Sequence, residues 1–322
     1  ARDTPKIAAA RPGGFGSPLS NAAMPMNASV GFPPKAFMIG AQKCGTTAFA
    51  AALSRHPDIE LASPKEPAFF TRNFSEGLAW YRDRFARHDK VLLDATPAYA
   101  MAPVAPRTQA AAPFSGVPER IREISPEARF LYLVRDPVRR AYSSFWHAVR
   151  SGAETRSLQE AVQPDSPYIW GSLYFHQISR YIEVFGRDAV LVIDVREWKK
   201  DSGACLARAF GHFGLEPPDD GLAIPRVNES YVFNTLGGFV QAHAMFNRPA
   251  TAAARLLKRA MPGSWYRRIR GLMVKDIPQI SENEYRDIRS MVEEDARAFA
   301  ELTGIDVFDG GAFSPSHGAA DD

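Results

Sequence analysis

The chain has 322 residues, of which 45% are hydrophobic and 23% charged, and its formal net charge is only +3. This composition is typical of a globular protein, and it excludes wholesale disorder, a fibrous repeat and a nucleic-acid binder marked by bulk positive charge. No run approaches the roughly 18 uninterrupted apolar residues of a membrane-spanning helix. Cys44 and Cys205 are the only cysteines. They are too few for a disulfide framework or a structural zinc site, so we expect a cytoplasmic protein without a metal centre.

The small net charge hides one strongly basic segment. Between Ser230 and Lys275 there is no Asp or Glu, and the Lys and Arg residues there carry +8, which leaves about −5 on the rest of the chain. Three roles remain open for the basic segment 248–275. The first is a lid over a bound phosphate. The second is a helix that lies on a membrane surface, which would make the chain a peripheral membrane protein. The third is an ordinary helical face exposed to solvent.

The sequence predicts one folded domain between two flexible ends. Residues 1–34 hold six prolines and four glycines without apolar periodicity, which is typical of a flexible arm. We place the domain at 35–313 and a disordered tail at 314–322. The proline-rich stretch 102–118 is expected to form a surface loop.

Strands and helices alternate along the domain. Short apolar runs predict buried strands at 36–40, 91–93, 130–134 and 189–195. Helices are predicted at 46–55, 138–150, 173–185, 205–213 and 282–303. This alternation predicts an α/β protein with a P-loop-like three-layer fold, in which helices flank a central parallel sheet on both sides.

A candidate phosphate loop joins the first predicted strand to the first helix. Its sequence is Gly40-Ala41-Gln42-Lys43-Cys44-Gly45-Thr46-Thr47. Glycines permit a tight turn, the amides at the helix start attract an anion, and Lys43 adds a full positive charge. In a nucleotide-triphosphate loop a lysine would stand at the position of Thr46, so an ordinary ATPase or kinase is disfavoured. A plain strand–turn–helix with an exposed lysine is the alternative.

A second candidate anion site follows the strand at 130–134. Arg135 comes directly after this strand, where open α/β sheets bind ligands, and Ser143 lies eight residues further on. A guanidinium and a hydroxyl group together suit a phosphate. Alternatively, Arg135-Asp136-Pro137 is only an ion pair at a helix start. Two phosphate sites would fit a nucleotide that is phosphorylated at both ends.

These motifs resemble those of sulfotransferases that use 3′-phosphoadenosine 5′-phosphosulfate (PAPS). The segment 42–47 is similar to their 5′-phosphosulfate loop, and 133–143 to their 3′-phosphate motif with the same Arg-to-Ser spacing. The segment 63–70 resembles the one that bears the catalytic glutamate in heparan-sulfate-type enzymes. The resemblance covers roughly residues 35–200. It implies that PAPS contacts a set of eight residues: Gln42, Lys43, Cys44, Gly45, Thr46, Thr47, Arg135 and Ser143.

The chain also departs from the heparan-sulfate enzymes. It has neither their cysteine pair nor their Lys-Gly-Arg loop, and Ala95 stands where they place a lysine. The basic segment 248–275 makes the chain more similar to bacterial relatives. The resemblance therefore implies the reaction class but not a polysaccharide acceptor.

The resemblance implies a role for each of five side chains. Glu66 would be the general base and Lys43 would stabilise the leaving phosphate, whereas a solvated Glu66 paired with Lys65 is the alternative. His147, one helical turn beyond Ser143, is the rival or assisting base, or a structural histidine. Lys65 and Tyr174 are expected to contact the acceptor, with a core position as the alternative for Tyr174.

The sequence as a whole predicts a PAPS-dependent sulfotransferase that needs no metal. The expected acceptor is a hydroxyl group, in preference to an amine, on a carbohydrate, a glycolipid or a small metabolite. One alternative is a P-loop kinase, which would need Mg²⁺ and a triphosphate. The other is a non-catalytic nucleotide-binding or membrane-associated protein with the same fold.

Overall fold

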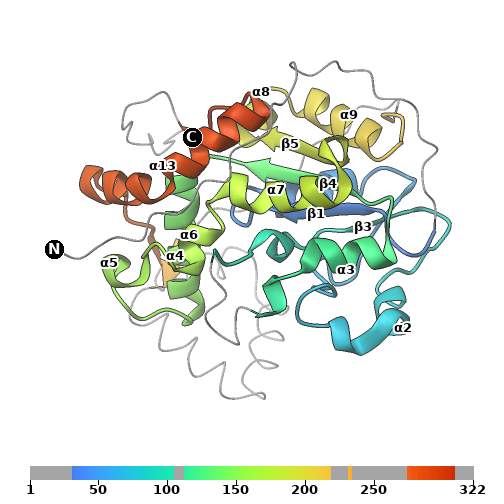
Figure 1. Cartoon of the computed structure of the whole chain (residues 1–322), viewed down its shortest axis with the longest axis horizontal. Coiled ribbons are helices and arrows are strands. Elements are labelled where there is room, and N and C mark those ends of the chain that lie inside the picture. Colours follow the sequence, from blue (N-terminus) through green and yellow to red (C-terminus); the bar gives the residue numbers. More distant parts are fainter. Residues whose placement is uncertain (1–30, 105–111, 219–230, 234–273, 309–322) are drawn as a thin grey trace, which may run out of the picture.

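A five-stranded parallel sheet forms the centre of the molecule. The computed structural model describes residues 31–104, 112–218, 231–233 and 274–308 (Figure 1). The strand order is β2-β3-β1-β4-β5, with every neighbouring pair parallel. The strands are β1 (Ala36–Gly40), β2 (Ile59–Leu61), β3 (Val91–Asp94), β4 (Arg129–Val134) and β5 (Val190–Asp194). The predicted α/β class with a central parallel sheet is confirmed.

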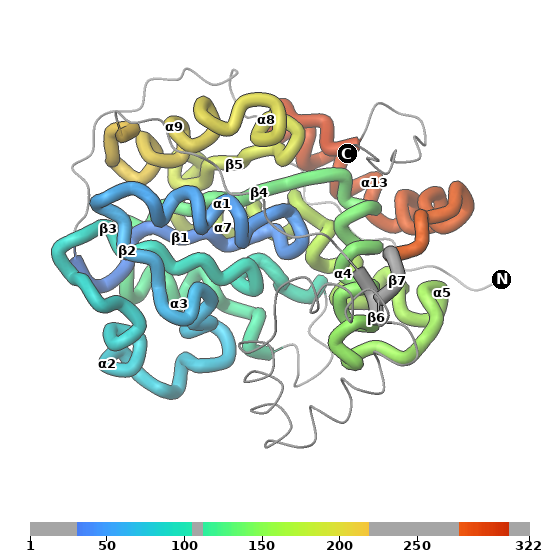
Figure 2. Tube along the Cα trace, turned by 180° about the vertical axis from the view of Figure 1, so that it is seen from behind, coloured from blue at the N-terminus to red at the C-terminus, as the bar shows by residue number. Residues whose placement is uncertain are grey.

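The inner strands are buried because helices cover both faces of the sheet. Every residue of β1 and β3 is buried, as are five of the six residues of β4. In Figure 1, α7 (Tyr174–Phe185) lies in front of the strands, and α3 (Val117–Ile124), which packs against α7, lies below them in this view. Figure 2 shows α1 (Thr46–Leu53) on the opposite face, near α9 (Ser202–His212). Continuous apolar runs, rather than alternating ones, are what such two-sided burial requires.

Two long helices lie beyond the carboxyl ends of the strands. The helix α4 (Pro137–Ser151) begins directly after β4, with the Asp136 carboxylate accepting a hydrogen bond from the Arg139 amide at 2.8 Å. The helix α13 (Glu282–Thr303) packs against α4 and α7 and has the predicted boundaries. A capping box of Ser281 and Glu284 fixes where α13 begins. The shorter helices are α2 (Gly77–Arg82), α5 (Leu158–Ala161), α6 (Pro167–Trp170) and α8 (Val195–Lys200).

Two of the predicted boundaries that differ from the structure do so because aspartates begin helices there. The fourth predicted strand ends at Asp194 rather than at residue 195, since the Asp194 carboxylate accepts a hydrogen bond from the Arg196 amide at 2.7 Å and caps α8. The helix predicted at 205–213 starts at Ser202, since Asp201 caps it through the Ala204 amide. In both places a local side-chain cap decides the boundary.

The strand order places a topological switch point beside β1. The chain runs from β1 to β2 and β3 on one side, and then crosses to β4 and β5 on the other. Ligands of open α/β sheets bind outside the carboxyl ends of the strands at such a point. The loops after β1 and β4 are therefore the two that flank the expected ligand site.

Several predicted segments lie outside the described residues. These are most of the arm at 1–34, residues 105–111 of the proline-rich stretch, most of the basic segment 248–275 and the tail. A short antiparallel pair, β6 (Tyr231–Phe233) with β7 (Val274–Asp276), is described on its own. Among the described helices, none is both long and apolar enough to cross a membrane.

Candidate active site

The loop between β1 and α1 has the backbone shape of an anion cradle. Lys43 adopts φ of 73° and Gly45 φ of 77°, so the chain turns twice through the left-handed region before α1 begins. Such a conformation is uncommon for a lysine and recurs at functional sites. Gly45 is the N-cap residue of α1 and has no side chain to cap it. The amides of the first helical turn therefore remain available to a bound anion.

Tyr174 joins this loop to the segment after β4. Its hydroxyl donates a hydrogen bond to the Arg135 carbonyl oxygen at 3.0 Å, and the Cys44 Sγ lies 3.7 Å from the same hydroxyl. The Arg135 guanidinium donates a long hydrogen bond, 3.4 Å, to the Lys43 carbonyl oxygen. The structure thus brings the two predicted phosphate motifs together, and Tyr174, which is fully buried, lies between them.

Lys43 lies in a strongly positive environment. Burial and, after it, the positive charges of Arg150, Arg135 and Arg140 lower its pKa to about 8. No carboxylate of the described residues is among the charges that act on it appreciably. Four cations held close together favour an anion between them, because a bound anion would offset their mutual repulsion.

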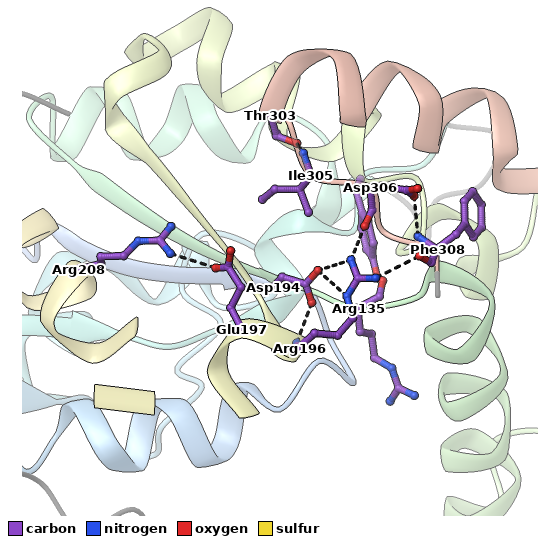
Figure 3. Close-up of polar contacts among 10 residues, drawn as sticks. Arg135, Asp194, Arg196, Glu197, Arg208, Thr303, Ile305, Asp306 and Phe308 are labelled. Atoms are coloured by element: carbon purple, nitrogen blue, oxygen red, sulfur yellow. Dashed lines mark hydrogen bonds and ion pairs between the residues drawn. The ribbon is translucent and has the colours of Figure 1, made fainter. Parts of the chain in front are cut away.

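Arg135 does not serve as an ion-pair partner at the start of α4. Asp136 is instead occupied by the Arg139 amide and by the Tyr285 hydroxyl, which donates at 2.6 Å. In Figure 3 the Arg135 side chain points away from the neighbouring network of Asp194, Arg196 and Asp306. Within the described part of the chain Arg135 forms no ion pair. Its guanidinium is therefore left for a ligand, as the phosphate interpretation requires.

Glu66 is paired with its sequence neighbour. The Lys65 ammonium lies 2.9 Å from Glu66 Oε1, and the side chains are 20% and 48% exposed respectively. This is the ion pair that the sequence left open as the alternative. Glu66 nevertheless belongs to the site. The charge of Glu66 and the charge of Lys43 both act on the pKa of His147.

His147 has a defined hydrogen-bonding state. Its Nδ1 lies 2.7 Å from Arg150 Nη2. A guanidinium can only donate, so Nδ1 accepts, and the proton of the neutral ring is on Nε2. Burial, followed by the charges of Lys43 and Arg150, lowers the pKa of His147. Near neutral pH the ring therefore offers a donor at Nε2 rather than a free base.

Ser143 lies on α4, partly buried, one helical turn before His147. Arg150 follows on the same face, three residues after His147. Neither Arg150 nor Arg140 was predicted from the sequence. The spacing of Arg150 from Ser143 and His147 was the signal that could have identified it. Arg140 gave no such signal, because an arginine is expected at the surface and this one is completely buried.

The loop fits a phosphate-bearing ligand. Gly45 and Thr47 are exposed and Gln42 and Lys43 are partly exposed, whereas Cys44 and Thr46 are buried and pack the loop onto the sheet. Backbone amides, a lysine and an uncommitted arginine form the donor set expected for phosphate groups. The described residues contain no cluster of three or more His, Cys, Asp or Glu side chains suited to a metal ion.

Curated proteins that match the chain are sulfotransferases. Human heparan sulfate glucosamine 3-O-sulfotransferase 6 is 36% identical over 114 residues, which are 35% of this chain and 30% of that protein. A bifunctional heparan sulfate N-deacetylase/N-sulfotransferase 1 from Caenorhabditis elegans is 28% identical over 188 residues, covering 52% of this chain and 20% of that protein. The chain thus matches less than a third of the length of these relatives.

The solved structures that match the chain include two sulfotransferases. A sulfotransferase from Alicyclobacillus acidocaldarius is 25% identical, covers 72% of this chain and 98% of its own, and has a TM-score of 0.49. A mouse sulfotransferase complexed with PAP is 20% identical over 58% of this chain and 61% of its own, with a TM-score of 0.40. The sulfotransferase domain model matches residues 33–289. Since this match spans most of the chain, the protein belongs to the sulfotransferase domain family.

Proposed function

We propose that this protein transfers the sulfuryl group of PAPS to a hydroxyl group of a carbohydrate acceptor, with Glu66 as the general base. Family membership supports sulfuryl transfer, and relatives named as 3-O-sulfotransferases of heparan sulfate glucosamine support a sugar hydroxyl. The observation that carries the proposal is the position of Lys43. It lies in the loop after β1, and the charges that act on it most strongly are those of three arginines.

The residues of the site have different roles in the proposed reaction. The acceptor oxygen attacks sulfur, the bond from sulfur to the phosphate oxygen breaks, and 3′,5′-adenosine bisphosphate (PAP) leaves. Lys43 stabilises the negative charge that grows on that bridging oxygen. The loop amides with Thr46 and Thr47 hold the 5′-phosphate, and Arg135 with Ser143 holds the 3′-phosphate. No metal is required, because these groups supply the positive charge.

The hydrogen-bonding state of His147 favours Glu66 as the base. Arg150 occupies the Nδ1 lone pair of His147, so the ring offers only its Nε2 proton. Glu66 is exposed and can accept the acceptor proton once the acceptor displaces Lys65 from one carboxylate oxygen. His147 then acts as a donor that orients the acceptor or a sulfonate oxygen, in keeping with an assisting role.

Calorimetric titration with PAP, compared with ATP plus Mg²⁺, tests the donor site. We expect metal-independent binding of PAP, weakened on the order of ten- to a hundredfold in Arg135→Ala, which loses a charge-assisted contact. Arg82→Ala is the matched control, since Arg82 is exposed on α2, away from the carboxyl ends of the strands (Figure 1). Binding of ATP with Mg²⁺ alone would instead support the kinase alternative.

A Glu66→Gln variant separates an enzyme from a non-catalytic nucleotide-binding protein. Assayed with PAPS and a glucosamine-containing oligosaccharide, the variant should lose most of its turnover while PAP affinity stays within about twofold of the wild type. Glu76→Gln, in the exposed turn before α2, is the control for the loss of one carboxylate. Unchanged turnover in Glu66→Gln would disprove the assigned base.

A further inference from the structure

We propose that Asp94, at the end of β3, is a positioning residue. It holds the segment 63–70, called the Glu66 turn below, in the conformation in which Glu66 acts as the base. This inference rests on the proposed role of Glu66 as the base. Asp94 is completely buried, and its carboxylate accepts hydrogen bonds from three hydroxyl groups. Thr96 donates to Oδ1 at 2.6 Å, and Tyr81 and Tyr99 each donate to Oδ2 at 2.7 Å.

Two of these hydroxyl groups also hold the segment that follows Glu66. The Ala68 amide donates to Thr96 Oγ1 at 3.3 Å, and the Phe70 amide donates to the Tyr99 hydroxyl oxygen at 3.3 Å. Ala68 adopts φ of 51°, a left-handed conformation that needs support in a residue other than glycine. Asp94 is thus linked to the backbone two and four residues after Glu66 by two parallel chains of hydrogen bonds.

The direction of each hydrogen bond makes the network depend on the charge of Asp94. A hydroxyl group has one proton, and Thr96 and Tyr99 both give theirs to the carboxylate. Their oxygen lone pairs then face the Ala68 and Phe70 amides. A carboxylate is able to accept from all three hydroxyl groups at once, whereas a carboxamide or a protonated acid presents a donor to at least one of them.

Lys65 connects the network to the reacting carboxylate from the other side. Its ammonium pairs with Glu66, and its charge also acts on Asp94. The charged and titratable groups that face Asp94 are Lys65 from the Glu66 turn, Tyr81 from α2, Tyr99 after β3 and Tyr181 from α7. Asp94 acts on Glu66 through this cation and through the turn, without touching the acceptor itself.

Tyr81 and Tyr99 provide a matched pair of variants. Both are fully buried and donate to the same Asp94 oxygen over the same distance. Among the described residues, only the Tyr99 hydroxyl also accepts a backbone amide of the Glu66 turn. Tyr99→Phe and Tyr81→Phe therefore remove equivalent hydrogen bonds to Asp94 and differ in whether the turn loses its support.

The first experiment compares amide hydrogen exchange in the wild-type protein and the two variants. We expect the Phe70 amide to exchange at least tenfold faster in Tyr99→Phe, and at the wild-type rate in Tyr81→Phe. This readout needs no acceptor and no turnover. Equal exchange in the two variants would overturn the assignment of Asp94 as a positioning residue.

The second experiment measures turnover with PAPS and a glucosamine-containing oligosaccharide. Tyr99→Phe and Asp94→Asn should lower kcat on the order of tenfold with an unchanged KM for PAPS, because only the base is misplaced. Tyr81→Phe should keep kcat within twofold. If Glu66→Gln is inactive while Tyr99→Phe is fully active, this inference fails and the proposed function stands. If Glu66→Gln is active, the proposed function itself fails.

Discussion

The Tyr174 hydroxyl donates to the Arg135 carbonyl oxygen at 3.0 Å, while Cys44 approaches the same hydroxyl at 3.7 Å. One buried side chain on α7 thereby fixes the spacing between the loop after β1 and the segment after β4. A nucleotide phosphorylated at both ends requires that these two anion sites keep a constant separation. Tyr174 thus has a structural role in holding the two motifs together. Its expected contact with the acceptor stays a prediction.

Tyr174→Phe should lower both stability and nucleotide affinity. The substitution leaves the part-buried Arg135 carbonyl and the buried Cys44 thiol without this partner, which costs on the order of 1–3 kcal/mol. Urea denaturation measures this loss, and calorimetry should show PAP binding weakened a few-fold. Tyr132→Phe is the control, since the buried Tyr132 hydroxyl has no hydrogen-bond partner among the described residues and its removal should not destabilise the protein. Equal losses in the two variants would argue against a specific link.

Lys43 should set the alkaline limit of kcat/KM. The lysine has a pKa of about 8 in the free protein, lowered first by burial and then by the neighbouring arginines. Above that pH it loses the charge that stabilises the leaving phosphate, so kcat/KM should fall above about pH 8. Lys43→Arg should retain its charge and shift this limb upward, whatever its effect on the absolute rate.

The pH profile of kcat provides an internal check on Lys43. A bound phosphosulfate raises the pKa of Lys43 by direct attraction, so the alkaline limb of kcat should lie above that of kcat/KM. Coincident limbs, or a limb that Lys43→Arg leaves in place, would assign the titration to another group.

Arg150 should control the protonation of His147. Removing the guanidinium in Arg150→Met takes away a neighbouring positive charge and the donor to Nδ1, both of which disfavour the imidazolium form. The pKa of His147 should therefore rise in this variant, as followed by NMR titration of the ring with His147→Gln for assignment. Arg286→Met, in an exposed ion pair on α13, should leave it unchanged. An unaltered titration in Arg150→Met would refute the proposed tautomer.

Much of the fold could be predicted because its signals are local. The apolar runs of β1 and β4 and the capping box of α13 each lie within a few residues, and all three elements occur as expected. The strand β2 has three residues and α8 has six, too short for a periodic pattern to distinguish. Their positions depend on pairing with β3 and on the cap at Asp194, which are tertiary and side-chain effects.

In the candidate site, too, some residues could be predicted from local motifs and others could not. Lys43 and Arg135 were predicted from motifs that follow strands, and their proximity follows from the strand order. Arg140 was missed because its partners come from a distant segment: it donates to Ser172, 32 residues away. Asp94 receives its hydroxyl groups from Thr96 and Tyr99, two and five residues further on, and from Tyr81, 13 residues earlier. Its partners are therefore close in the sequence, and what the sequence did not display is its complete burial among them.

The first glycine of the phosphate loop should tolerate no side chain. A Cβ at Gly40 would lie 2.4 Å from the Tyr132 ring, which is fully buried and cannot move aside. Gly40→Ala should therefore destabilise the protein by about 1–3 kcal/mol in urea denaturation. Gly211→Ala, inside α9 with nothing within 4 Å of its Cβ, should instead stabilise it by up to about 1 kcal/mol. The opposite signs separate local crowding from a general effect of replacing glycine.

Asp94 should make the protein less stable as the pH rises through the weakly acidic range. Burial raises its pKa from 3.8 to about 6, against the opposing effect of its three hydroxyl donors. The folded state then binds a proton that the unfolded chain has released, so the contribution of Asp94 to stability is full below about pH 4 and lost by about pH 6. Two pKa units correspond to about 3 kcal/mol.

Asp94→Asn removes this titration and isolates it experimentally. The difference in unfolding free energy between variant and wild type should change by up to about 3 kcal/mol in favour of the variant between pH 4 and pH 7. Asp295, whose pKa burial raises to about 7, is present in both proteins and cancels in the difference. A flat difference would mean that Asp94 titrates normally in the fold. A variant that is more stable at neutral pH yet slower in turnover would show that the buried charge is kept for the geometry of the Glu66 turn rather than for stability.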